Sequence, residues 1–189
     1  MSIRVERLTA ENFSSLDALF GTSRECGLCW CMNHRRRPEN EVQGADARNA
    51  LHALTREGKV QGMLAFHGEA CVGWCAVDPL SEQPGHDYNF WKHAESDKDT
   101  WSIHCLFIHP DFRGKGISTS LIVESIALAK DQGAKRILAF PIPPEKRKHF
   151  PAHDGEFSGR HSTFVKAGFK EDTRINDFYS VMSLDVAPA

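Results

Sequence analysis

The spacing of apolar and polar positions predicts the elements of the N-terminal third. Residues 3–8 alternate apolar and charged side chains, which is the period of a strand with one buried face. Thr9 is expected to cap a short helix whose apolar positions recur every three or four residues up to Gly21. Residues 22–38 follow neither period and are expected to be irregular. A second helix is expected over residues 39–57, because its apolar positions again share one helical face.

Two strands and a long loop are expected next. Residues 60–66 and 71–77 are rich in apolar side chains, and the sequence His-Gly-Glu-Ala between them suits a hairpin turn. Residues 78–100 are polar and interrupted by proline and glycine. Irregular segments of this length are uncommon in compact domains and often serve a function, so this loop is a candidate wall of a binding site.

The C-terminal half predicts helices that alternate with strands. The strand expected over residues 101–108 lacks clean alternation, as is typical when both faces of a sheet are covered. The further expected elements are a loop at 109–116, a helix at 117–132, a strand at 136–140, a loop at 141–159, a short helix ending at Gly168 and a strand at 178–184. This order predicts an α/β fold of mixed (α+β) type, a twisted mixed sheet with helices on both faces, formed by residues 1–189 as one domain.

Composition narrows the class of protein. The 189 residues are 41% hydrophobic and 25% charged, with a formal net charge of −2, which is typical of a globular domain. Proteins that act on nucleic acid usually carry a strong basic excess, so no nucleic-acid partner is expected. The N-terminus lacks the apolar run of a signal peptide, and no later run could cross a bilayer. We therefore expect no membrane partner, a cytoplasmic location and six cysteines present as free thiols.

The segment from Arg113 to Ser118 has the features of an anion site. An expected strand leads into a turn that contains Gly114 and Gly116, and the turn opens directly into an expected helix. Backbone N–H groups at the start of a helix lack partners within the helix and lie at the positive end of its dipole. Glycine lets an anion approach the backbone closely, because it carries no side chain. This arrangement suits a pyrophosphate, although a basic surface turn that only caps a helix has the same local sequence.

Residues 106–118 resemble the acetyl-CoA signature of the GNAT superfamily of N-acetyltransferases, which is Gln/Arg-x-x-Gly-x-Gly/Ala at a strand-to-helix turn. Arg113 matches its first position and Gly116 its glycine, whereas Ser118 replaces the final small residue. Downstream, Phe-Val-Lys-Ala-Gly-Phe at residues 164–169 resembles the Tyr-x-x-x-Gly-Phe of the family.

The resemblance implies an N-acetyltransferase that transfers an acetyl group from acetyl-CoA to an amine of a small molecule or a peptide, by direct attack of the amine on the thioester. A homodimer is a further possibility, since dimers are frequent among such proteins. The resemblance implies that the backbone of Leu106, Phe107 and Ile108 binds the pantetheine arm of the cofactor and that Phe164 packs against it. The residues implied to bind the pyrophosphate are Arg113, Gly114, Lys115, Gly116, Ile117 and Ser118.

The groups that would move protons match the family less well. Ser102 stands where relatives often carry a glutamate base, and serine cannot take that role. His104 lies two residues on, on the same strand face. An unperturbed imidazole has a pKa of about 6.5, so His104 is the candidate general base; otherwise it is a histidine that fills a strand position. Phe164 replaces a tyrosine that often protonates the leaving thiolate.

Without that tyrosine, Ser162 or His161 would assist through water, or the thiolate would leave unassisted. Phe164 and Ser102 motivate an alternative function, a catalytically silent acyl-CoA-binding sensor or interaction module, while the acetyltransferase stays the leading hypothesis.

Three cysteines crowd together in the irregular segment. Cys26, Cys29 and Cys31 lie close in sequence to His34. Zinc usually takes four ligands supplied by two separated pairs, and only one compact group is present, so no metal is expected. In the resembled fold this segment joins two helices that line the acceptor pocket, and the thiols are expected to form part of its wall.

Two tryptophans and a basic run have more than one interpretation. Trp30 and Trp74 would add aromatic surface to the acceptor pocket or belong to the core. The basic run at residues 34–37 is expected to be solvated, although it could also meet the 3′-phosphate of coenzyme A or an acidic acceptor.

Overall fold

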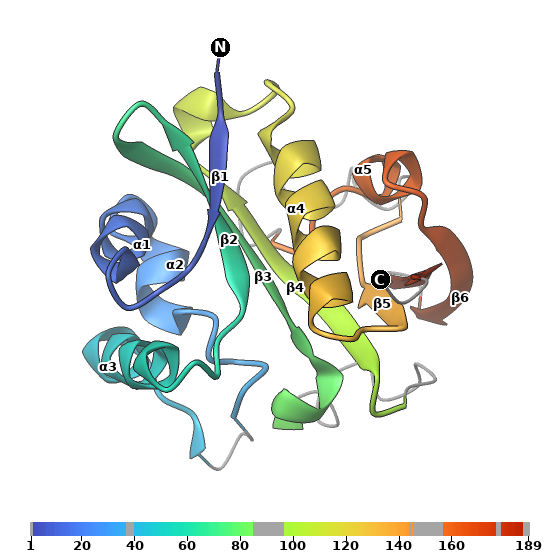
Figure 1. Ribbon diagram of the computed structural model, residues 1–189, viewed down its shortest axis with the longest axis horizontal. Coiled ribbons are helices and arrows are strands. Elements are labelled where there is room, and N and C mark those ends of the chain that lie inside the picture. The colour runs from blue at the N-terminus through green and yellow to red at the C-terminus, as the bar shows by residue number, and fades with distance from the viewer. Residues whose placement is uncertain are drawn as a thin grey trace.

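Twelve helices and strands form one mixed architecture in the computed structural model, which describes residues 2–36, 40–84, 97–143, 145, 157–176 and 179–186 (Figure 1). In chain order they are β1 (Arg4–Arg7), α1 (Phe13–Phe20), α2 (Arg24–Cys29), α3 (Gly44–Arg56), β2 (Gly62–His67), β3 (Ala70–Pro79), β4 (Thr100–Ile108), α4 (Ile117–Asp131), β5 (Arg136–Ala139), α5 (His161–Lys166), β6 (Lys170–Asn176) and β7 (Tyr179–Asp185). Short 3-10 turns follow β3 and β4, at Leu80–Glu82 and Pro110–Phe112.

The strands join into a seven-stranded sheet in the order β1-β2-β3-β4-β5-β7-β6. Neighbours are antiparallel except β4 and β5, which pair in parallel. That parallel pairing covers only Thr100–Ile103 of β4 and the whole of β5, so the second half of β4 continues beyond its partner. The predicted mixed sheet is confirmed.

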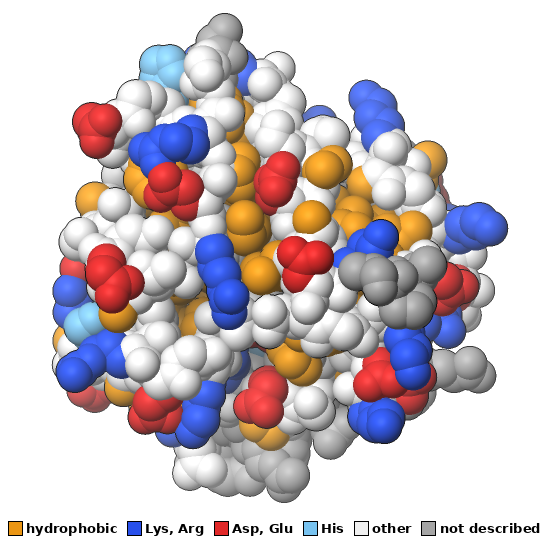
Figure 2. Space-filling view, in the orientation of Figure 1, with side chains coloured by type: hydrophobic (Ala, Val, Ile, Leu, Met, Phe, Trp, Pro, Cys, Tyr) orange, Lys and Arg blue, Asp and Glu red, His pale blue; other side chains and the backbone are white. Residues whose placement is uncertain are grey.

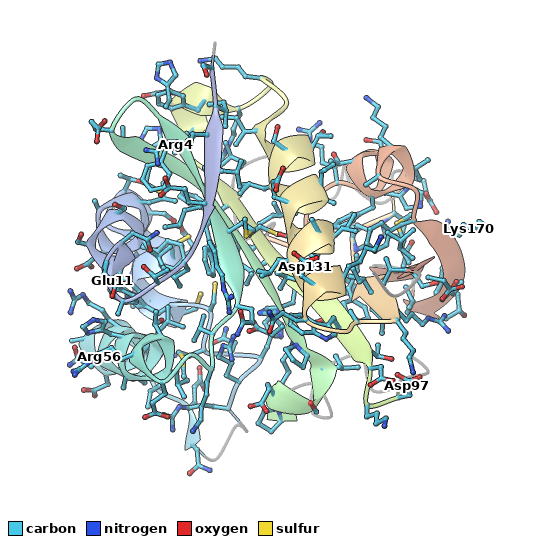
Figure 3. The ribbon with its side chains drawn as sticks, in the orientation of Figure 1. Arg4, Glu11, Arg56, Asp97, Asp131 and Lys170 are labelled. Atoms are coloured by element: carbon cyan, nitrogen blue, oxygen red, sulfur yellow. The ribbon has the colours of Figure 1, made fainter. Side chains whose placement is uncertain are left out.

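Helices cover both faces of the sheet, because strands β2 to β4 carry apolar side chains on both sides. One buried cluster joins the sheet to α4 and α5, and includes Leu121, Ile122 and Phe164. The other joins the opposite face to α1, α2 and α3, and includes Phe20, Trp30 and Trp74. Figure 1 shows α4 across one face and the N-terminal helices grouped together. The charged residues labelled in Figure 3, such as Glu11, Arg56 and Lys170, lie at the periphery.

Four details of the predicted elements were wrong. The helix predicted over residues 39–57 is α3, which begins only at Gly44. The irregular segment contains a helix, α2, which begins after Ser23, whose side chain accepts a hydrogen bond from the Cys26 N–H. The helix α1 begins after Asn12 and not after Thr9. Strand β6 lay in no predicted element, because its sequence KEDTRIN is that of a polar edge strand, and only pairing with β7 holds it extended.

Acidic and basic side chains are interspersed over the face shown in Figure 2. This distribution agrees with the near-neutral net charge of the sequence.

Within the described ranges, none of the helices has both the length and the apolar character that a membrane-spanning helix requires.

Candidate functional site

The turn between β4 and α4 contains two glycines in a backbone conformation that favours glycine. Gly114 and Gly116 have φ angles of +74° and +81°, in the left-handed region that favours glycine. A Cβ atom at either position would meet no atom within 4 Å, so the space above both residues is open. Gly116 is also the N-cap of α4, and the first turn of that helix carries no acidic side chain. No carboxylate of this turn therefore competes for the positive end of the helix dipole.

The main-chain N–H groups of this turn are available to a ligand. In the part of the chain that the structure describes, no hydrogen bond to another protein group is made by the N–H groups of residues 114–118. The first helical amide with an internal partner is that of Thr119, which donates to the Gly116 carbonyl at 3.0 Å. Two side chains brace the turn: Arg113 Nε donates to the Ile108 carbonyl at 3.1 Å, and Lys115 Nζ to the Asp111 carbonyl at 2.8 Å. Arg113 to Gly116 are exposed and Ile117 is buried, and binding of a pyrophosphate at this turn stays a prediction.

Strand β4 contains a bulge at its centre. Its register against β3 shifts so that Cys105 faces Ala76 and Ile103 faces Val77, which leaves His104 as the extra residue. Beyond the bulge, β5 has ended, and the edge of β4 on that side lies outside the parallel ladder. A strand that continues beyond the end of its neighbour has backbone groups that need other partners.

Residues 157–160 supply such a partner. The Leu106 N–H donates to the Phe157 carbonyl at 2.6 Å, and the Phe157 ring lies 6.1 Å from that of Phe107. Arg160 forms an isolated parallel bridge with Ile142, which follows β5. The 157–160 segment therefore lies between β4 and the continuation of β5. Leu106, which the sequence assigned to the pantetheine arm, already has a protein partner for its N–H in this structure.

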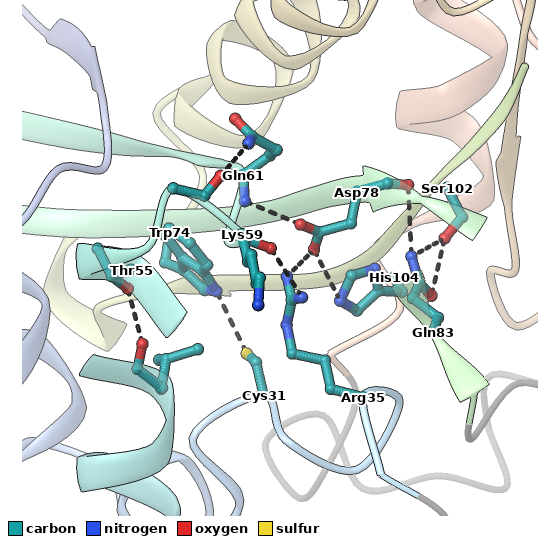
Figure 4. Close-up of polar contacts among 12 residues, drawn as sticks. Cys31, Arg35, Thr55, Lys59, Gln61, Trp74, Asp78, Gln83, Ser102 and His104 are labelled. Carbon is teal, nitrogen blue, oxygen red and sulfur yellow. Dashed lines mark hydrogen bonds and ion pairs between the residues drawn. The ribbon is translucent and has the colours of Figure 1, made fainter. Parts of the chain in front are cut away.

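A buried polar network lies on the opposite face from α4, beside the bulge (Figure 4). The side chain of Asp78, which is fully buried, forms an ion pair with Arg35 and accepts a hydrogen bond from the Gln61 N–H at 2.8 Å. His104 Nε2 lies 3.8 Å from Asp78 Oδ2. Burial raises the pKa of the Asp78 carboxyl, and the charge of Arg35 opposes that rise. The ring of His34 packs edge-on against that of His104, at 4.9 Å between centroids.

This network changes how the sequence is interpreted at three positions. His104 and Ser102 share one face of β4, as predicted. The His104 side chain, however, has no exposed surface. Ser102 donates a hydrogen bond to Gln83 at 3.1 Å and accepts one from Gln83 at 2.9 Å. The expectation that the basic run at residues 34–37 is solvated was wrong for Arg35, which is only 8% exposed. Its guanidinium is drawn inward because Asp78 needs a buried partner. Arg37 lies outside the described residues.

Sequence reasoning missed Asp78 and Phe157. Asp78 stands at the end of an apolar strand, and a carboxylate there was a usable signal of a buried pair. No feature of the sequence indicated the contact of Phe157 with Leu106, because that contact depends on the path of the chain after β5.

The residues of α5 are placed apart from His104. Phe164 is fully buried and packs against Phe169, at 5.2 Å between ring centroids. Ser162 is exposed, and His161 Nε2 lies 2.9 Å from Glu171 Oε2. The structure does not bring Ser162 together with the other candidate catalytic residue. Contact of Phe164 with a cofactor stays a prediction.

The cysteine segment belongs to the core. Cys26 and Cys31 are buried, and the Cys31 thiol accepts a hydrogen bond from Trp74 Nε1 at 3.3 Å. Burial raises the pKa of Cys26 to about 12, so this thiol stays protonated. Trp30 and Trp74 are 5% and 0% exposed, which agrees with the core interpretation of both tryptophans. No cluster of three His, Cys, Asp or Glu side chains suited to a metal is found within the described ranges.

A turn at Trp30 and Cys31 connects the cysteine segment to the residues of the polar network. Trp30 and Cys31 have φ angles of 46° and 52°, although neither is glycine, and the Met32 N–H donates to the Cys29 carbonyl at 2.8 Å. Left-handed backbone at such residues costs about 1–3 kcal/mol each and is retained where packing enforces it. The buried Trp30 ring and Cys31 thiol supply that packing, and the turn directs the chain towards His34 and Arg35.

A cavity of about 380 Å³ borders the glycine turn on the side of α1. Its walls come from α1, from the tip of the β2–β3 hairpin and from His109 and Phe112. The Phe112 ring also lies 4.9 Å from Lys115 Nζ, so one wall of the cavity contacts the turn itself.

The chain matches one protein family and is similar in fold to several solved structures. Residues 28–149 match the family model described as the acetyltransferase (GNAT) family. A comparison with curated proteins found no match. Among solved structures, the PaiA N-acetyltransferase from Thermoplasma acidophilum in complex with coenzyme A is similar, with 14% identity, 98% of this chain and 100% of that chain covered, and a TM-score of 0.60.

Two other structures are similar to the chain. The GNAT domain of PAT from S. lividans has 17% identity, covers 98% of this chain and 92% of its own, and has a TM-score of 0.60. The ribosomal-protein-S18-alanine N-acetyltransferase from Escherichia coli has 8% identity, with 100% and 96% covered, and a TM-score of 0.56. At these identities the likeness concerns the fold.

Proposed function

Because this chain belongs to the acetyltransferase (GNAT) family, we propose that it transfers an acetyl group from acetyl-CoA to an amine of a small molecule or a peptide. The observation that carries the proposal is the exposed turn at residues 114–118, whose N–H groups have no protein partner among the described residues. Two glycines with open space above them leave room for a pyrophosphate at that turn.

The residues proposed for the pyrophosphate of acetyl-CoA need no rearrangement, whereas those proposed for its pantetheine arm do. Arg113 to Ser118 would hold the pyrophosphate through main-chain N–H groups. The backbone of β4 at Leu106, Phe107 and Ile108 would hold the pantetheine arm, once the Phe157 carbonyl has left the Leu106 N–H. When bound, acetyl-CoA supplies a thioester carbonyl for attack by an amine. A main-chain donor at that carbonyl contributes a few kcal/mol to the stability of the transition state.

His104 is proposed to accept the proton of the attacking amine. Asp78 lies 3.8 Å from its ring, and a nearby carboxylate stabilises the cationic imidazolium that proton transfer produces. The His34 ring, which belongs to the segment between α2 and α3, packs on the His104 ring, and His104 has no exposed side-chain surface, so the acceptor would reach His104 only once His34 has moved aside. That segment is therefore a proposed wall of the acceptor site.

The function is tested by release of free thiol from acetyl-CoA. The purified protein is expected to release thiol only when an amine acceptor is supplied, and mass spectrometry should find the acceptor 42 Da heavier, the mass of an added acetyl group. The acceptors to screen are polyamines, amino acids, aminoglycosides and peptides with a free amino group. Binding of coenzyme A by calorimetry without turnover on any acceptor would favour the alternative, a sensor, which the absence of a hydroxyl at Phe164 motivates.

His104→Gln is expected to lower kcat by about 100-fold or more, because a positioned general base typically contributes 10²–10⁴-fold. The dissociation constant of coenzyme A should be unchanged, since His104 contacts Asp78 and His34 and is not among the residues proposed to hold the cofactor. Steady-state kinetics and calorimetry measure the two quantities. Ser102→Ala, on the same strand face, is the matched control and should retain activity. An unchanged kcat in a folded His104→Gln protein would remove His104 from the mechanism.

A further inference from the structure

The edge of β4 beyond its pairing with β5 is occupied by the chain itself. β5 ends at Ala139, opposite Ile103, so the next part of β4 has no partner strand there. The 157–160 segment enters this gap and contacts both sides of it, through the Leu106–Phe157 hydrogen bond and the bridge between Ile142 and Arg160.

The fit of this segment is close. Gly159 has a φ of +79°, and a Cβ atom there would lie 2.9 Å from Leu106 Cδ1 and 2.9 Å from Phe164 Cε2. Such distances are shorter than a carbon–carbon van der Waals contact, so any larger residue at position 159 would force the side chain of Leu106 or Phe164 to move. The Phe157 ring packs at the edge of the cluster that includes Phe107. The 157–160 segment therefore occupies the edge of β4 at Leu106.

The contact at Leu106 has the chemistry of cofactor binding. The Phe157 carbonyl accepts from the same N–H that the proposed function assigns to a carbonyl oxygen of the acyl-pantetheine arm. An amide carbonyl and a pantetheine carbonyl are alternative acceptors for one donor, and one N–H cannot serve both with good geometry. The Phe157 carbonyl thus stands in for the carbonyl of the cofactor.

We propose that the 157–160 segment is an autoinhibitory plug, and that coenzyme A binds by displacing it from the edge of β4. The proposal rests on the proposed function, because it needs a pantetheine arm at this edge. Displacement exchanges the hydrogen bond at Leu106 for another, so its cost lies in the packing of the Phe157 ring and of Gly159 and in loss of the bridge between Ile142 and Arg160. The measured affinity for the cofactor is then the intrinsic affinity reduced by the fraction of molecules in which the plug is open.

Phe157→Ala tests the plug. Removing the ring weakens the closed state, so the dissociation constant of coenzyme A, measured by calorimetry, is expected to fall about three- to tenfold. Val165→Ala, an exposed position on α5, is the control and should bind as the wild type does. Equal or weaker binding by Phe157→Ala would overturn the plug, because Phe157 would then be neutral or part of the cofactor site.

A measurement on the wild type keeps the proposal testable if the variant fails to fold. Hydrogen exchange followed by mass spectrometry should show faster exchange of the amides at residues 157–160 when coenzyme A is added. Slower exchange there would overturn the plug. Absence of coenzyme A binding by both the wild type and Phe157→Ala would overturn the proposed function itself.

Discussion

Gly116→Glu is expected to weaken binding of coenzyme A by at least about 100-fold while the protein remains folded. The new carboxylate would stand at the N-cap of α4, in the open space above the turn. A negative charge placed against the diphosphate costs several kcal/mol, and about 2.7 kcal/mol corresponds to 100-fold in the dissociation constant. Calorimetry with coenzyme A measures the loss, and circular dichroism checks the fold.

Gly133→Glu is a matched control for this substitution. Gly133 follows the other end of α4, has a φ of +89° and also faces open space, so the backbone strain and the added charge are the same. This variant should bind coenzyme A normally. Normal binding by Gly116→Glu, or equal loss in both variants, would contradict the assignment of the turn to the pyrophosphate.

Asp78→Ala is expected to lower the free energy of unfolding by about 3–5 kcal/mol, because it leaves the buried charge of Arg35 without its partner. The Gln61 N–H also loses the acceptor that it has in Asp78 Oδ1. Since domains of this size are stable by about 5–15 kcal/mol, this is a large fraction of the total. Urea unfolding at neutral pH measures the change.

The double variant Arg35→Met with Asp78→Leu separates loss of the pair from loss of packing. Replacing a buried ion pair by apolar side chains is often neutral, so the double variant should be more stable than Asp78→Ala by about 2 kcal/mol or more. If the loss of unfolding free energy in the double variant equals the sum of the losses in Arg35→Met and Asp78→Leu measured singly, Asp78 and Arg35 are not energetically coupled.

The local sequence was enough to predict the strand-turn-helix unit that carries the proposed cofactor site. The apolar stripe of α4, the strand before it and the two glycines of the turn are local features, because periodicity and positive φ depend on near neighbours. The segment at residues 106–118 therefore predicted both an anion site and the family. The unpartnered N–H groups at residues 114–118 agree with that prediction.

Contacts between distant segments could not be predicted from the sequence. The ion pair of Arg35 with Asp78 joins a helix connection to a strand, and Arg35 appeared in the sequence as part of a solvated basic run. Strand β6 has a polar sequence and is extended only because β7 lies beside it. Each feature depends on a partner more than 30 residues away or on another strand, and local propensity carries no information about that partner.

The sequence by itself predicted the mixed sheet and the glycine turn, since these rest on short-range patterns of apolar spacing and backbone freedom, and the motifs at residues 106–118 and 164–169 indicated the family by their resemblance to its signatures. Only the tertiary structure decided that Arg35, Asp78 and His104 form one buried network, and that Phe157 lies on the Leu106 N–H. The physical reason is that these residues are buried and hydrogen-bonded by segments distant in sequence. Folding alone brings Arg35 to Asp78 and Phe157 to the part of β4 beyond β5.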